Sequence, residues 1–330
     1  MSDNIIYDLL NESCVEGLLR REVGDNLELI AIKPIKKQIW HTTYHVVFRY
    51  TVKVAGVVRQ IFVTAHDCEP REVALKSLDY LYTHGFGKGE CLVPQPLFFE
   101  QKYNATFYFG LSGENLYHFI KENDRSEIEK LIKKTAHWFA LLHSVAIDDK
   151  LVFNLSNAKI STVSPGADAV LSAIDEHYPE LVESYHSFYD YFIQNEDKNL
   201  AQVDLNMIHG DAHPENVIRL ADDKIGVIDF VDMAVGDRAR DIGTFLQQLG
   251  YMGMRKISDP IFVQAMQDLF LTSYLESAKM EMSADLQARI DLYFNWTAIR
   301  TATFFLMKHD PEPERARALV GEVKINLNIK

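Results

Sequence analysis

The stretch from Ile208 to Asp241 reads IHGDAHPENVIRLADDKIGVIDFVDMAVGDRARD, and the interpretation of the whole chain starts from it. Asp211 and Asn216 stand five residues apart in its first part, and Asp229 ends the apolar run that follows. A strand, a turn and a second strand would bring these three side chains together. Carboxylate and amide oxygens are the hard ligands that Mg²⁺ prefers. The stretch therefore predicts a magnesium site next to a further carboxylate.

Phosphoryl transfer needs the same few groups. One aspartate orients and deprotonates the acceptor hydroxyl, while an asparagine and a second aspartate hold the metal ions that bridge the nucleotide phosphates. Protein kinases separate the catalytic Asp and the metal-binding Asn by the same five positions. Single pieces of the stretch also have simpler explanations: H-G-D alone fits a turn, Asp222 and Asp223 fit a solvated hairpin turn, and Asp237 fits a helix cap.

Taken together, the motifs resemble those of the aminoglycoside phosphotransferase and choline kinase-like family. His209–Asn216 is similar to the family's H-G-D-x-H-x-x-N signature, and Ile228–Phe230 is similar to its metal-binding I-D-F. Gly236–Asp241 matches G-D-x-x-x-D, whose last Asp resembles an anchor of the catalytic loop. Leu142–Ser144 resembles the L-H-S end of a helix, and Gly113–Leu116 resembles the G-x-x-L that follows the hinge between the lobes.

By this resemblance the protein is an α+β, two-lobed protein-kinase-like enzyme that uses Mg²⁺ with ATP or GTP as cosubstrate. Asp211 is then the catalytic base, and Asn216 and Asp229 bind Mg²⁺. His209 braces the catalytic loop in preference to transferring a proton. The hinge backbone that reads the nucleobase consists of Phe109, Gly110 and Leu111.

The order of the expected elements agrees with two lobes. Residues 1–110 form a small lobe with a main helix over Pro70–Gly85, and residues 111–330 form a larger, mostly helical lobe. This is not the alternating pattern of a parallel α/β sheet. The expected strands of the small lobe are Leu27–Lys33, Tyr44–Ala55, Val57–His66, Gln95–Glu100 and Thr106–Leu111. The expected helices of the large lobe include Ser126–Val145 and segments within 178–195, 261–282 and 284–307.

The small lobe departs from the kinase pattern at its third strand. A basic residue there normally binds the nucleotide phosphates and pairs with a helix Glu, for which Glu72 is the candidate. Thr64 or His66 occupies the expected place of that basic residue, and the two share one face of the strand. Either a protonated His66 contacts a phosphate, or Lys53 reaches across from the neighbouring strand.

The loop expected to cover the phosphates, Pro34–Thr42, is also unusual because it contains no glycine. A glycine-rich loop lets backbone N–H groups approach phosphates closely. Lys36 and Lys37 provide positive charge in its place, or the loop is an exposed basic turn; the sequence does not decide between these alternatives.

Composition excludes several classes of protein. A formal net charge of -13 over 330 residues argues against partners that are polyanions, namely nucleic acid and anionic membrane. The three cysteines are far apart and form no C-x-x-C pair, which argues against a disulfide framework or a zinc site. There is no secretory signal pattern at the beginning, and no apolar run approaches the roughly 20 residues that span a bilayer. We expect a cytoplasmic protein whose partners are a nucleotide and a small-molecule acceptor.

Two functions remain open at this point. The first is an active kinase for a hydroxyl of a small metabolite or an aminoglycoside-like molecule; acidic residues near Asp211 would then receive an amine-bearing acceptor. The second is a pseudokinase that binds nucleotide without turnover, which the missing strand lysine favours. A protein-substrate kinase is disfavoured because no A-P-E-like stretch follows Asp229.

Overall fold

The computed structural model describes residues 5–39, 43–148, 151, 153, 155–221 and 223–329. The chain forms two compact units. The first comprises the described residues of 1–114, 149–153 and 218–231, and the second those of 115–148, 154–217 and 232–330. The units thus differ from a single division at 110/111, because the segment 218–231 returns to the first unit.

The first unit is built on a five-stranded antiparallel sheet in the order β1-β2-β3-β6-β5. Ala55 and Gly56 join β2 to β3 with φ angles of 49° and 85°, as the tight hairpin turn requires. A three-stranded sheet of β4, β9 and β8 belongs mainly to the same unit. The strand bounds are β1 Leu27–Ile39, β2 Tyr44–Val54, β3 Val57–His66, β4 Cys91–Leu92, β5 Gln95–Glu100, β6 Ala105–Phe109, β8 Val217–Arg219 and β9 Ile225–Val227.

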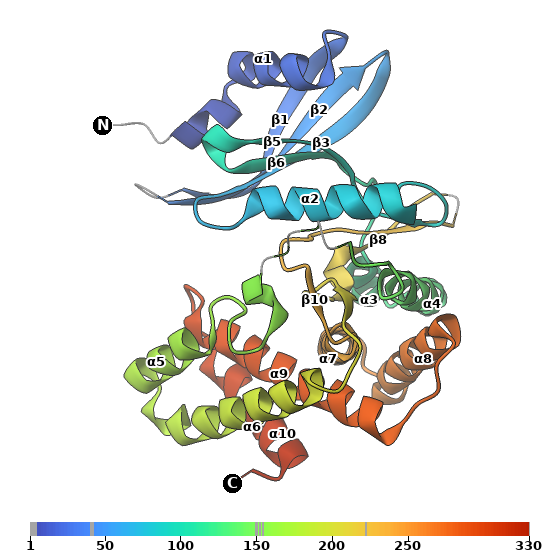
Figure 1. The fold of residues 1–330 in the computed structure, drawn as a ribbon. Coiled ribbons are helices and arrows are strands. Elements are labelled where there is room, and N and C mark those ends of the chain that lie inside the picture. The colour runs from blue at the N-terminus through green and yellow to red at the C-terminus, as the bar shows by residue number, and fades with distance from the viewer. Residues whose placement is uncertain are drawn as a thin grey trace. The chain divides into compact units, whose positions relative to one another are not determined.

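The two faces of the five-stranded sheet are chemically different. Alternate residues of β2, β3 and β6, such as Phe48, Val63 and Phe107, are fully buried in one apolar core. The helix α1 (Glu12–Val23) contributes to this core and covers that face, while α2 (Arg71–Leu81) lies on the opposite side (Figure 1). The face toward α2 carries polar side chains, including Thr64 and His66. The predicted sharing of one face by Thr64 and His66 is confirmed.

The second unit is helical around an aromatic core. The largest of its fully buried side chains include Trp138, Phe139, Phe188 and Phe192. Its short antiparallel strands are β7 (Asn206–Ile208) and β10 (Ala234–Gly236). Its helices are α3 Leu116–Glu122, α4 Arg125–Leu142, α5 Ala167–His177, α6 Val182–Leu200, α7 Ala239–Met254, α8 Pro260–Ala278, α9 Ala284–Met307 and α10 Pro313–Leu327. No helix in the described ranges has both the length and the apolar character to cross a membrane.

The α+β class and the predicted strand and helix order are confirmed, with one correction in the small lobe. The expected loop Pro34–Thr42 is strand as far as Ile39, and its residues 40–42 lie outside the described residues. Pro34 is tolerated because β1 is an edge strand, and the ladder shifts register between Pro34 and Lys36.

Candidate functional site

The loop that follows β7 carries the H-G-D motif, and a buried carboxylate of α7 fixes its backbone. The Asp241 Oδ2 atom accepts a hydrogen bond from the His209 amide at 2.7 Å, and Oδ1 accepts one from the Gly210 amide at 2.9 Å. Gly210 has a φ of +84°, and a Cβ atom there would lie 2.1 Å from the Asp232 carbonyl oxygen. The loop conformation therefore requires glycine at this position.

Asp241 is itself held by two further elements. Its side chain is 1% exposed and lies 3.1 Å from Nε2 of His143, whose Nδ1 is 2.7 Å from the Tyr274 hydroxyl. Burial alone would raise the pKa of Asp241. The hydrogen bond and charge of His143, His209 and the Gly210 amide outweigh burial, so the pKa lies below its usual value. Asp241 therefore holds the backbone of the H-G-D loop, which is the anchoring position that the sequence suggested for it.

His209 lies inside the unit and has no access to solvent. Its ring centroid is 6.4 Å from that of Trp138 and 6.3 Å from that of Phe139, and its Nδ1 accepts a hydrogen bond from the Asp211 amide at 3.3 Å. This is the position of a residue that shapes the loop.

Asp211 lines a pocket of about 570 Å³ in the second unit, and its side chain is 34% exposed. Its Oδ2 is 3.4 Å from His213 Nε2, and its Oδ1 is 3.8 Å from Arg300 Nη1. Arg300 also contacts Asp232 at 3.3 Å. Burial would raise the pKa of Asp211, but His213, Arg300 and His209 together hold it well below its usual value. Asp211 is thus a carboxylate that is ionised and open to a pocket.

Asn216 is buried at the end of the same loop. Its amide nitrogen donates a hydrogen bond to the Asp211 carbonyl oxygen at 3.0 Å. Because the amide nitrogen faces the Asp211 carbonyl oxygen, the side-chain oxygen of Asn216 points away from that carbonyl. Oxygen is the atom that a Mg²⁺ ion would bind, so the donor set of this residue fits the metal.

Asp229 belongs to the first unit, where it follows β9. Its φ of +68° is unusual for a residue other than glycine, although Asp tolerates it better than most. It lines a small pocket of about 40 Å³ together with Thr64, Arg71 and Tyr108. The Thr64 and Tyr108 hydroxyl oxygens are 3.2 Å apart. A carboxylate held in this conformation at a pocket suits a metal ligand.

The remaining nucleotide-site predictions differ in where the structure places them. His66 lies on the same face of β3 as Thr64. It is 3.4 Å from Glu69, and its ring centroid is 4.8 Å from that of His45. Glu72 is 55% exposed and pairs with Lys76 at 2.8 Å, so the structure does not bring it to Thr64 or His66. Lys53 pairs with Val58 at the far end of β3 and does not reach Thr64.

The predicted hinge residues lie at the end of β6 and directly after it. Phe109 is its last residue, and the Arg59 guanidinium carbon lies 3.3 Å from the centre of its ring. The Gly110 amide donates a hydrogen bond to the Gln60 carbonyl oxygen at 2.9 Å. Leu111 packs on Gly226 of β9, where a Cβ atom would lie 2.1 Å from Leu111 Cδ1. The hinge segment is therefore fixed on both sides within the first unit.

Sequence reasoning missed Arg71, which lines the pocket of Asp229 although it begins a helix. The available signal was that Arg71 is the only Lys or Arg between Arg59 and Lys76. Sequence reasoning also did not distinguish Lys36 from Lys37 as the source of positive charge. The structure separates them: Lys36 is half-buried and contacts His45 at 3.1 Å, whereas Lys37 is exposed and lies over the Tyr7 ring.

Comparison with known proteins bears on the family and the fold of the chain. The model of the phosphotransferase enzyme family, APH, matches residues 32–279. Among solved structures, the chain is similar to an ethanolamine kinase of Plasmodium vivax (16% identity, 93% of this chain and 84% of that one, TM-score 0.61). It is also similar to the choline kinase of Streptococcus pneumoniae (14%, 96% and 99%, 0.59) and to a spectinomycin phosphotransferase in complex with ADP and spectinomycin (11%, 96% and 97%, 0.58).

At these identities the likeness shows the fold, and the expected protein-kinase-like fold is confirmed. A search of curated proteins found no match.

Proposed function

Because this chain belongs to the phosphotransferase enzyme family, we propose that it transfers the γ-phosphate of ATP or GTP to a hydroxyl group of a small molecule. The observation that carries the proposal is Asp211, a carboxylate kept ionised by its neighbours and open to a pocket large enough for a small acceptor. Its loop is fixed by Asp241, so the carboxylate is positioned before any substrate binds.

Asp211 acts on the acceptor hydroxyl. The hydroxyl donates a hydrogen bond to the carboxylate, which orients one oxygen lone pair toward the γ-phosphorus. As the new oxygen–phosphorus bond forms and the bond to the leaving nucleoside diphosphate breaks, the hydroxyl proton passes to Asp211. Because the pKa of Asp211 is low, the proton is transferred only after most of the new oxygen–phosphorus bond has formed. Before that, the main contribution of Asp211 is to orient the hydroxyl.

Asn216 and Asp229 are the residues that would hold Mg²⁺. Both present oxygen, and the Asn216 amide is already oriented by its hydrogen bond to Asp211. The bound metal would neutralise negative charge on the nucleotide phosphates.

The lining of the Asp211 pocket narrows the acceptor class. Its charged side chains besides histidine are three carboxylates, Asp211, Glu215 and Glu312, and four cations, Arg255, Arg300, Lys308 and Arg315. Lys308 and Arg315 both pair with Glu312, and Arg300 lies beside Asp211. Such a lining does not attract a polycation, so we propose an uncharged or anionic hydroxyl compound, in place of the amine-bearing acceptor expected from the sequence.

Thermal unfolding with ATP and with GTP, each with and without Mg²⁺, tests the nucleotide site. A nucleotide at about 100 times its Kd adds roughly 2.7 kcal/mol, which raises the Tm by a few degrees. A Mg²⁺-dependent shift supports the proposal and identifies the donor. A shift that is independent of Mg²⁺, without turnover of any acceptor, favours the pseudokinase alternative, which the lysine-free β3 makes reasonable.

The catalytic assignment is tested by Asp211→Asn. Turnover should fall by about 10²–10⁴, while nucleotide binding persists. Asp197→Asn, an exposed aspartate of the same unit paired with Lys159, is the matched control and should retain full turnover. A loss of less than about tenfold in Asp211→Asn would contradict its role as base.

The acceptor class is tested by a panel in which sugar acids and polyols compete with aminoglycosides. Preference for the aminoglycosides would contradict the acceptor class proposed from the charges that line the Asp211 pocket.

A further inference from the structure

We propose that the guanidinium group of Arg71, at the beginning of α2, binds the nucleotide phosphates and supplies the positive charge that β3 lacks at its end, where Thr64 and His66 stand. This inference rests on the proposed function. It concerns only residues of the first unit, and it assigns to a helix residue the task that a strand lysine performs in the kinase pattern.

The burial of Arg71 is the first observation. The residue is 5% exposed, and its Nε atom has no hydrogen-bond partner among the described residues. Its Nη2 atom forms an ion pair with Glu69. Arginine carries five N–H donors, and a buried donor without an acceptor costs free energy. A guanidinium in this state is suited to a further anionic acceptor, and phosphate oxygens match its fork of donors.

The position of Arg71 is the second observation. It lines the pocket that also contains Thr64 and Asp229, the residue proposed to hold Mg²⁺. Thr64 is one of the two residues, with His66, expected at the place of the strand lysine, and its short side chain carries no charge. The pocket volume of about 40 Å³ has room for a group of a few atoms and not for a whole nucleotide. A phosphate group is of that size class.

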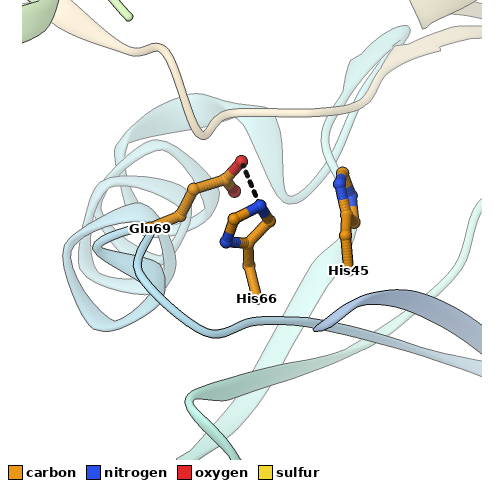
Figure 2. A group of neighbouring side chains, drawn as sticks. All are labelled: His45, His66 and Glu69. Atoms are coloured by element: carbon orange, nitrogen blue, oxygen red, sulfur yellow. Dashed lines mark ion pairs between the residues drawn. The ribbon is translucent and has the colours of Figure 1, made fainter. Parts of the chain in front are cut away.

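The ion pair of Arg71 with Glu69 corresponds to the lysine–glutamate pair of kinases, but its two residues come from other elements than in kinases. In kinases the cation stands on the strand and the carboxylate on the helix. Here both come from one short segment, Glu69–Arg71, where the connection from β3 enters α2. Glu69 Oε1 also lies 3.4 Å from His66 Nε2 (Figure 2), whereas Arg71 pairs with Oε2, so both carboxylate oxygens are held.

A second cation supports an anion site on this face. Lys36 is 3.1 Å from Nδ1 of His45. Burial lowers the pKa of Lys36, and the charge of Arg71 lowers it further, while Glu69 and Asp229 act in the opposite direction. Burial, Lys36 and Arg71 also lower the pKa of His45 to about 4. His45 is therefore neutral at pH 7, and Lys36 and Arg71 are two cations that act on the same groups, so a bound phosphate would be attracted by both.

The same neighbours argue against a metal cation at the cluster of His45, His66 and Glu69 (Figure 2). Their ligand atoms lie within 4.8 Å of one another, which is compatible with metal binding. However, Lys36 stands against His45, and Arg71 stands against Glu69. A metal ion would have to bind next to two cationic side chains, whereas an anion would be attracted by both.

The test compares ligands that differ only in phosphate content. The Kd values of nucleoside, nucleoside diphosphate and nucleoside triphosphate, with Mg²⁺, are measured by calorimetry for the wild type, Arg71→Gln and Arg71→Lys. In Arg71→Gln the di- and triphosphate should bind about 10- to 100-fold more weakly, and the nucleoside within about threefold of the wild type. Arg71→Lys should be intermediate, because it keeps the charge and loses the fork.

Two further variants keep the inference falsifiable. Lys76→Gln removes an exposed cation of the same helix, paired with Glu72, and should bind all three ligands as the wild type does. The double variant Thr64→Lys, Arg71→Gln places a cation at position 64 of β3 and should recover triphosphate affinity. Unchanged triphosphate binding in Arg71→Gln, or equal weakening of the nucleoside, would overturn the inference and leave the proposed function standing. A wild type that binds no nucleotide would overturn both.

Discussion

Replacing Asp241 by Asn isolates the anchor of the H-G-D loop with the smallest change of shape. The carboxylate accepts hydrogen bonds from two backbone amides, those of His209 and Gly210, through its two oxygens. Asparagine offers one acceptor oxygen, and its amide group would point donors at the second N–H. The substitution also removes the negative charge that faces His143 at 3.1 Å.

The magnitude follows from these contacts. A buried amide that loses its acceptor costs about 1–3 kcal/mol, and a hydrogen bond to a charged group contributes about 1.5–3 kcal/mol. We therefore expect Asp241→Asn to lower the free energy of unfolding by about 3–5 kcal/mol, which is also the range for breaking a buried ion pair. Asp197→Asn should change it by less than about 0.5 kcal/mol.

Urea unfolding followed by tryptophan fluorescence measures both variants, because Trp138 and Trp296 are buried in the same unit. The pH dependence has a defined sign. The folded-state pKa of Asp241 is lowered, so its contribution is present above the unfolded pKa of about 3.9 and is lost as the pH falls through the folded value. The difference between wild type and Asp241→Asn should shrink in acid. A loss below about 1 kcal/mol at pH 7 would refute the anchoring role.

Three further predictions concern the same unit. Gly210→Ala should lower turnover by at least about tenfold in single-turnover assays, because a Cβ atom would lie 2.1 Å from the Asp232 carbonyl oxygen; wild-type turnover would contradict the fixed loop. The stability difference between wild type and Asp211→Asn should be constant above about pH 5 and shrink below pH 4, because the pKa of Asp211 is lowered; a difference that grows in acid would have the wrong sign. Glu196 has a raised pKa, mainly through burial, so its contribution is full below about pH 4.3 and declines as the pH rises. Glu196→Gln should therefore gain stability relative to wild type between pH 4 and pH 7 in urea titrations, and a pH-independent difference would show that Glu196 does not titrate as described.

The loop from His209 to Asn216 was predictable from sequence because its parts are local and chemically constrained. Gly210 needs a positive φ, and Asn216 contacts the backbone of Asp211 within five residues. The anchor Asp241 stands at a fixed spacing in the first turn of a helix, where its carboxylate faces two loop amides. Such short-range requirements leave a sequence signature.

The small-lobe cation was not predictable for a geometric reason. Successive residues of a helix differ by about 100° in direction, so Glu72 and Arg71 cannot both face the sheet. The segment PREVALKSL does not say which of them faces inward, and the structure turns Arg71 into the pocket and Glu72 toward solvent. The charge of the Asp211 pocket was equally hidden, because its cations come from the residue that follows α7, from α9, from α10 and from the segment between the last two.

The chain of contacts from Asp241 through His143 to Tyr274 has a consequence for how the molecule opens. It connects the loop after β7 to the end of α4, to α7 and to α8, which form the interior of the second unit. The amide protons of His209 and Gly210, although they belong to a loop, should therefore exchange with deuterium as slowly as those of the buried helices, and only when the unit as a whole opens. Any local excursion that released Asp211 from its position would have to disrupt those helices first.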